Sequence, residues 1–191
     1  MDRSKSHSTR SQGITLISVV LSLAILVTVV LIATQFTIRN QRLSALSRQQ
    51  FIATNLSREG LELVRAIRDT NQMQIAETSA SISWVEGICD STLPAHIPQT
   101  FTVSYEDDWP DPTAQPNLFL MNGFYTHHDG PASTPTPYKR TITADCSYAQ
   151  SDDATAENKP VHVTISSQVN WDYRGEPRSV VLITKLYDWY E

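Results

Sequence analysis

The fold is decided by residues 14–33, which read ITLISVVLSLAILVTVVLIA. These 20 residues carry no charge, and no charged residue occurs anywhere from Ser11 to Ile38. As an α-helix the run would be about 30 Å long, which matches the hydrocarbon core of a bilayer. Three basic residues precede it within positions 1–10. We therefore expect the N-terminus to stay in the cytoplasm, residues 14–38 to form a membrane helix, and the rest of the chain to be exported.

Two ordinary explanations of such a run are a cleaved secretory signal and an uncleaved signal anchor. A secretory signal has an apolar stretch of about 7–15 residues followed by a small-residue cleavage site. The run in this chain is longer, and only a weak small-x-small site lies near its end. The uncleaved anchor, an exported protein that joins no filament, therefore remains as an alternative.

The junction before the run is more specific. A polar leader ends at Gln12-Gly13, and the apolar residues begin abruptly at Ile14. The stretch GITLISVV, residues 13–20, resembles the class III signal of type IV pilins and pseudopilins. In that family a membrane aspartyl peptidase, the prepilin peptidase, cuts after the glycine and methylates the new N-terminal residue. The resemblance implies that residues 1–13 are a leader peptide, that cleavage falls between Gly13 and Ile14, and that Ile14 is methylated.

The chain departs from the family pattern at two positions. Ile14 stands where the first mature residue is usually phenylalanine, a change between two large apolar side chains. Ser18 occupies the fifth mature position, where most members have a glutamate thought to neutralise the N-terminal amine of a neighbouring subunit. An unpaired ammonium in an apolar bundle costs several kcal/mol. Ser18 therefore fits a subunit at the filament tip, with no neighbour ahead of it, or is a chance substitution in a minor subunit.

The helix is expected to continue beyond the membrane. No proline occurs before Pro94, so nothing forces a break. Residues 39–70 are expected to be an amphipathic continuation, because apolar and small residues recur at spacings of three and four: Ala53, Leu56, Gly60, Leu63, Val64 and Ile67. The stretch EGLELVRAIRD, residues 59–69, also resembles one found in PilV-like minor pilins.

Residues 71–191 are expected to form an exported head rich in β-strands. Alternation at period two marks residues 101–105, 138–148, where Arg140 interrupts it, and 161–173. A turn at 174–177 and an apolar run at 180–186 complete a hairpin, and this ending resembles the tail of PilV-like proteins and pseudopilins. Polar loops are expected at 106–117, 126–137 and 149–160. The family resemblance implies an α+β fold, with a long N-terminal helix packed on an antiparallel sheet of about four strands.

Charge is divided along the chain. Residues 39–68 carry six arginines against two glutamates, whereas residues 69–191 carry 17 acids against six bases. An acidic head repels nucleic acid, so we expect no nucleic-acid partner.

The chain has two cysteines, Cys89 and Cys146, both in the acidic head. Behind a membrane segment the head would face an oxidising compartment, where an even count favours one disulfide. Two buried free thiols are the alternative. Neither cysteine belongs to a CxxC motif, which argues against a redox role.

No catalytic constellation and no cofactor motif stand out, so we expect no enzyme. Asp107, Asp108 and Asp111 offer carboxylates but lack the spacing of a defined calcium loop. The run His127-His128-Asp129 is read as solvated loop residues rather than a metal site. Four tryptophans are expected to be core or helix-packing residues rather than a ligand platform: Trp84, Trp109, Trp171 and Trp189.

The expected function is structural: a minor pilin or pseudopilin that initiates, caps or decorates a type IV pilus-like filament used in attachment, motility or secretion. Its partners would be other pilin subunits, the prepilin peptidase and the pilus assembly platform. It would be held in the inner membrane before assembly and displayed at the cell surface afterwards. A tip-displayed adhesin or substrate-binding module is a second hypothesis, because specificity usually lies in exposed loops on a rigid scaffold.

Overall fold

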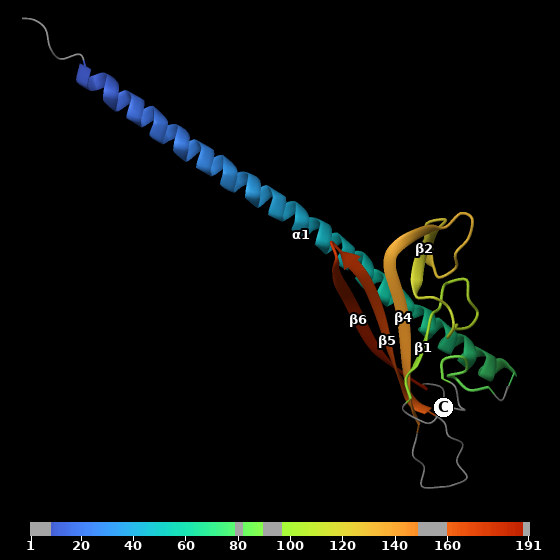
Figure 1. Cartoon of the computed structure of the whole chain (residues 1–191). Helices are drawn as coiled ribbons and strands as arrows, with labels where there is room; N and C mark the ends of the chain where they lie inside the picture. The colour runs from blue at the N-terminus through green and yellow to red at the C-terminus, as the bar shows by residue number, and fades with distance from the viewer. Residues whose placement is uncertain (1–8, 79–81, 90–96, 149–159, 189–191) are drawn as a thin grey trace, which may run out of the picture. The chain divides into compact units, whose positions relative to one another are not determined.

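The computed structural model describes residues 9–78, 82–89, 97–148 and 160–188. One helix, α1, runs from Thr9 to Thr78 and is followed by strands of a single antiparallel sheet (Figure 1). The fold is thus α+β, as expected. The chain divides into two compact units, residues 1–48 and 49–191.

The first unit contains only helix. Every described residue from Leu16 to Ala45 is exposed, including the large apolar ones. The hydroxyls of Ser22, Thr28 and Thr34 donate to the carbonyls of the preceding turn, so the polar side chains are satisfied within the helix itself. By length and composition, α1 is the one helix in the described part of the chain able to cross a membrane.

The second unit begins within α1 and contains the sheet. Helix α1 ends at Thr78 rather than at residue 70. The strands are β1 (Gln99–Phe101), β2 (Asn117–Met121), β3 (Phe124–Thr126), β4 (Thr134–Tyr148), β5 (Pro160–Tyr173) and β6 (Glu176–Tyr187). Their order is β3-β2-β4-β5-β6, and β1 also pairs with β4. The sheet has six strands, so the expectation of about four was too low.

The two additional strands lie between the expected loops at 106–117 and 126–137, where no element was expected. Strands β2 and β3 form a hairpin whose turn, Asn122-Gly123, has positive φ at both residues. Strand β4 begins at Thr134, so the expected loop at 126–137 is wrong over its last residues. The loop expected at 149–160 lies outside the described residues up to 159, and Pro160 already belongs to β5. The expected hairpin at the end of the head is confirmed, with Arg174-Gly175 as its turn.

The core lies between the C-terminal part of α1 and one face of the sheet. The predicted helical stripe is confirmed, because Ala53, Leu56, Val64 and Ile67 are buried. The larger of two apolar clusters joins the helix to β1, β4 and β5, and the smaller joins Ala53 and Leu56 to Leu118, Tyr138, Val169 and Trp171. Each buried side chain of leucine size stabilises the fold by about 1.5–3 kcal/mol.

Gly60 brings the helix close to the sheet. A Cβ atom at this position would lie 2.7 Å from the Ser167 hydroxyl and 3.1 Å from Cδ of Arg140. One turn earlier, the Ser57 hydroxyl donates to the Ser167 carbonyl over 2.7 Å. The glycine therefore allows a close helix–sheet approach, as its position in the predicted stripe suggested.

Candidate binding groove

The residues predicted to control processing and assembly lie in the first unit. Gly13 and Ile14 fall within the first turns of α1, and Ser18 is exposed further along the same helix. Cleavage after Gly13, methylation of Ile14 and the role of Ser18 stay predictions.

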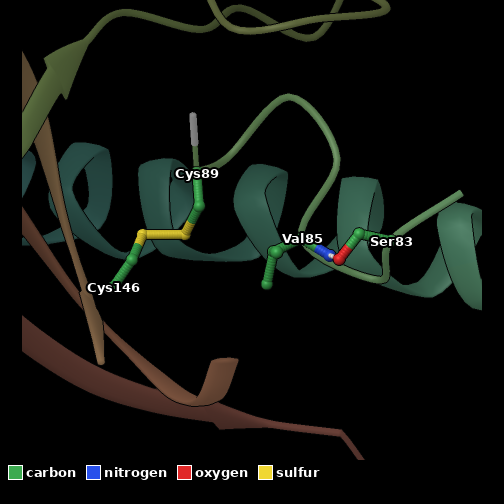
Figure 2. Close-up of a disulfide and its surroundings, with 4 residues drawn as sticks. All are labelled: Ser83, Val85, Cys89 and Cys146. Carbon is green, nitrogen blue, oxygen red and sulfur yellow. Dashed lines mark hydrogen bonds between the residues drawn. A yellow bond between two sulfur atoms is a disulfide. The ribbon is translucent and has the colours of Figure 1, made fainter. Parts of the chain in front are cut away.

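The two cysteines meet in the second unit. Cys89 and Cys146 form a disulfide with their Cα atoms 6.2 Å apart, within the usual range (Figure 2). Cys146 is buried on the inward face of β4, as predicted, and Cys89 belongs to a short segment of turns at 84–89. Close by, the amide of Val85 approaches the Ser83 hydroxyl at 3.5 Å (Figure 2). The disulfide thus ties the segment after the helix to a central strand.

The strongest candidate for a binding site is a groove of about 360 Å³ between α1 and the loop that follows β1. The helix contributes Leu63, Ala66, Ile67 and Thr70 to its wall. The loop contributes Tyr105, Asp107, Asp108 and Trp109. The groove therefore combines an apolar wall, two aromatic rings and two carboxyl groups, a composition typical of ligand sites.

The loop is held by its own hydrogen bonds. Its two ends are joined by paired backbone bonds between Thr102 and Asp111, at 2.9 and 2.8 Å. Inside it, the Asp107 carboxylate accepts from the Ser104 amide at 2.7 Å, and the Asp107 amide donates back to the Ser104 carbonyl at 3.1 Å. A loop ordered in this way loses little conformational entropy when it binds.

Trp109 lies over Gly87 at one end of the groove. A Cβ atom at Gly87 would lie 2.3 Å from the indole ring, and Gly87 also has a φ of +75°. Only glycine therefore fits beneath this ring. Trp109 is nonetheless 49% exposed, so of the two expected roles, core or helix packing, the structure contradicts only the core position.

Of the other tryptophans, Trp84 and Trp171 are buried as expected, and Trp189 lies outside the described residues.

Tyr105 supplies the second aromatic ring. Its hydroxyl donates to the Glu106 carboxylate, and this hydrogen bond raises the pKa of Tyr105. The ring also packs on the exposed Phe124 from β3, with centroids 5.0 Å apart. The expected alternation at 101–105 is not seen, because residues 101–104 are all buried, Tyr105 is exposed and β1 ends at Phe101.

Behind the loop, the buried guanidinium of Arg140 joins strand β4 to helix α1 and to the residue Val103. Arg140, on β4, is completely buried and donates to the Glu59 carboxylate at 3.0 Å, to the Leu56 carbonyl at 3.3 Å and to the Val103 carbonyl at 2.8 Å. Burial lowers the pKa of Arg140, and the charge of Glu59 opposes that shift. The sequence suggested that Arg140 interrupts the inward face of β4. The structure shows instead that Arg140 belongs to that face.

The two adjacent histidines differ. His128 is exposed, and its Nε2 lies 2.6 Å from Oδ1 of Asp107. His127 is buried, contrary to the solvated reading, and its Nδ1 lies 3.2 and 3.1 Å from the carbonyls of Gln115 and Asn117. Two carbonyl acceptors require Nδ1 to carry the proton. Burial, followed by the charge of Arg140, lowers the pKa of His127 to about 4.

The carboxylates of the loop point to different internal partners. Oδ1 of Asp111 accepts from the amide and hydroxyl of Thr113, which lowers the pKa of Asp111, whereas Asp107 binds Ser104 and His128. In the part of the chain that the structure describes, no three His, Cys, Asp or Glu side chains come together to hold a metal ion.

The chain matches no protein-family model, no curated protein and no solved structure. Its function is therefore inferred from its own residues and geometry.

Proposed function

We propose that the chain is a structural subunit of a membrane-anchored filament of the type IV pilin kind, as a minor pilin or pseudopilin. The observation that carries this proposal is helix α1, which is continuous from Thr9 to Thr78. Its first part exposes apolar side chains all round, whereas its last part buries one face against the sheet. A single helix with these two parts can hold a head domain to a membrane and to an apolar helical bundle.

The first part of α1 suits two apolar environments, the membrane before assembly and the helical bundle of a filament after it. Before assembly, residues 14–38 would cross the inner membrane, because no charged side chain in them needs water. On assembly the same exposed side chains would pack against the helices of neighbouring subunits. The head would lie in an oxidising compartment, a location that the Cys89–Cys146 pairing supports.

The test is the N-terminus of the native protein. Mass spectrometry of the chain from cells with an active prepilin peptidase should find a species that begins at Ile14 and carries one added methyl group. Gly13→Leu should block the cut and keep the leader attached. A native protein that still begins at Met1 would contradict the filament proposal and favour the uncleaved anchor.

A second function, a binding module displayed by the filament, is favoured by the groove beside Trp109. The indole of Trp109 is 49% exposed and lies in the groove beside the exposed Tyr105 and the apolar wall of α1. A contiguous exposed apolar surface of this kind is typical of interaction sites. This second function would operate together with the structural one. It predicts that Trp109→Leu lowers ligand binding while filaments still form.

A further inference from the structure

We infer that the groove between α1 and the loop at 103–109 binds an arginine side chain presented by the helix of a neighbouring filament subunit. The inference rests on the proposed filament function, since it names a partner within that assembly. It follows from the charge of the groove, from its aromatic rings and from the arginine-rich helix that this chain itself carries.

The charge of the groove is of one sign. Asp107 and Asp108 are its ionisable carboxylates, Glu106 lies between the two aromatic positions of the loop, and the lining includes no lysine or arginine. The buried cation Arg140 is bonded to Glu59 and also interacts electrostatically with Asp107. A positively charged group that enters the groove would therefore meet two adjacent carboxyl groups, of which Asp107 already contacts His128.

The carboxylates have acceptor positions left for a ligand. An ionised carboxylate offers about four lone-pair sites. The two internal partners of Asp107, the Ser104 amide and His128, occupy different oxygens of the group. Asp108 is exposed at the groove. Two adjacent carboxylates can thus accept the several parallel N–H groups of a guanidinium.

The aromatic rings favour arginine over lysine. Trp109 and Tyr105 line the groove with 49% and 45% of their surfaces exposed. A planar, weakly hydrated guanidinium stacks on such rings, whereas an ammonium is strongly hydrated and cannot stack. The apolar wall of Leu63, Ala66 and Ile67 suits the methylene groups of the same side chain.

The chain shows what the partner helix would look like. Residues 39–58 of α1 carry four exposed arginines and no acid, at Arg39, Arg42, Arg48 and Arg58, although Ala53, Leu56 and Ser57 in the same stretch are buried in the head. Subunits built on the same plan would bring basic helices next to acidic heads. Such a head-to-helix contact is heterologous, because it joins two different surfaces of the neighbouring subunits.

The experiment uses the full-length chain in zwitterionic detergent micelles and a fluorescent peptide of residues 39–58. The matched control is the same peptide with all four arginines replaced by citrulline, which keeps the shape and removes the charge. Peptide binding to empty micelles is subtracted. We expect the citrulline peptide to bind about tenfold more weakly.

Variants and the indole N–H signals locate the contact. Trp109→Leu and Asp108→Asn should each weaken arginine-peptide binding, by about tenfold and about threefold. In NMR spectra of the wild-type chain, the indole N–H signal of Trp109 should shift when the arginine peptide is added. The signals of the buried Trp84 and Trp171 should stay in place.

Equal affinity for the two peptides, or affinity unchanged by both variants, would overturn the inference. Neither result bears on the N-terminus at Ile14, so failure of the groove and failure of the filament proposal are distinguishable.

Discussion

The two parts of helix α1 use apolar residues in opposite ways. Between Leu16 and Leu31 leucine, valine and isoleucine occur all round the helix and remain exposed, Leu26 by 63%. Between Ala53 and Ile67 they occur on one face and are buried, Leu56 to 2% exposure. The backbone is the same continuous helix in both parts.

The environment that a helix requires depends on how its apolar residues are distributed round it, and not only on their number. A helix that is apolar all round needs an apolar surrounding on every side, and the described residues of the chain leave 16–45 exposed. A one-sided helix is satisfied by one sheet. The second part is further fixed to the sheet by polar contacts, which have no counterpart in the described residues of the first part.

The largest effect is expected from the buried Arg140. Arg140→Ala should lower the free energy of unfolding of the head by about 4 kcal/mol, because it leaves a cavity and removes the donor from Glu59 and two buried carbonyls. Denaturant unfolding in micelles, followed by near-ultraviolet circular dichroism, measures it. Arg48→Ala, at an exposed helical position, is the control and should change stability by less than about 0.5 kcal/mol. An equal loss of stability in Arg140→Ala and Arg48→Ala would contradict the prediction that polar contacts stabilise the head and not residues 16–48.

The same substitution in both parts tests the comparison directly. Leu56→Ala should destabilise the head by about 3 kcal/mol, through lost burial and the cavity it leaves. Leu26→Ala should leave head unfolding unchanged within about 0.5 kcal/mol, because this side chain lies outside the core. A comparable loss in both variants would mean that residues 16–45 also support the head.

Sequence patterns predicted what depends on periodicity. The apolar run, the stripe from Ala53 to Ile67, the final hairpin and the inward position of Cys146 all follow from spacing alone. The β2–β3 hairpin was missed although Asn122-Gly123 is a strong local signal for a two-residue turn. Its strands are too short for alternation to be visible.

The groove could not be predicted in the same way. It is formed by residues 63–74 and 103–109, which meet only through tertiary packing. Trp109 was assigned to the core or to helix packing together with the other tryptophans, and Arg140 was assigned as an interruption of the alternation, because a buried arginine is rare. The core position of Trp109 and the interruption at Arg140 are contradicted by the structure, because their partners, Gly87 and Glu59, lie far away in the sequence.

A smaller effect is expected from pH, again confined to the head. The pKa of His127 is lowered to about 4, so the unfolded chain, with an ordinary value near 6.5, binds the proton first as pH falls. Stability is therefore full above about pH 6.5 and decreases between that value and about 4, by about 2 kcal/mol at pH 5. The charged groups near this ring are Arg140, which lowers its pKa, and Asp107, which raises it.

The pH effect is isolated with His127→Asn, which keeps an N–H donor for the carbonyls of Gln115 and Asn117 but does not titrate. Unfolding at pH 7 and pH 5 should show the wild-type chain losing about 2 kcal/mol more than the variant. Helicity of residues 9–48 should not change over this range, since they include no group that titrates there. An identical pH dependence in both chains would show that His127 is not the group responsible.

The smallest effect is expected at Ser18, in the first part of the helix. If the chain is a filament subunit at the tip, it has no neighbour ahead whose N-terminal amine needs a carboxylate. Ser18→Ala should then leave the number of filaments unchanged, and immunogold labelling of an epitope-tagged copy should mark filament ends. Ser18→Glu restores the carboxylate common in the resembling family and should allow the tagged copy to enter the shaft as well. Label spread evenly along the shaft with Ser18 in place would contradict the tip assignment. It would mean that a partner side chain compensates the amine.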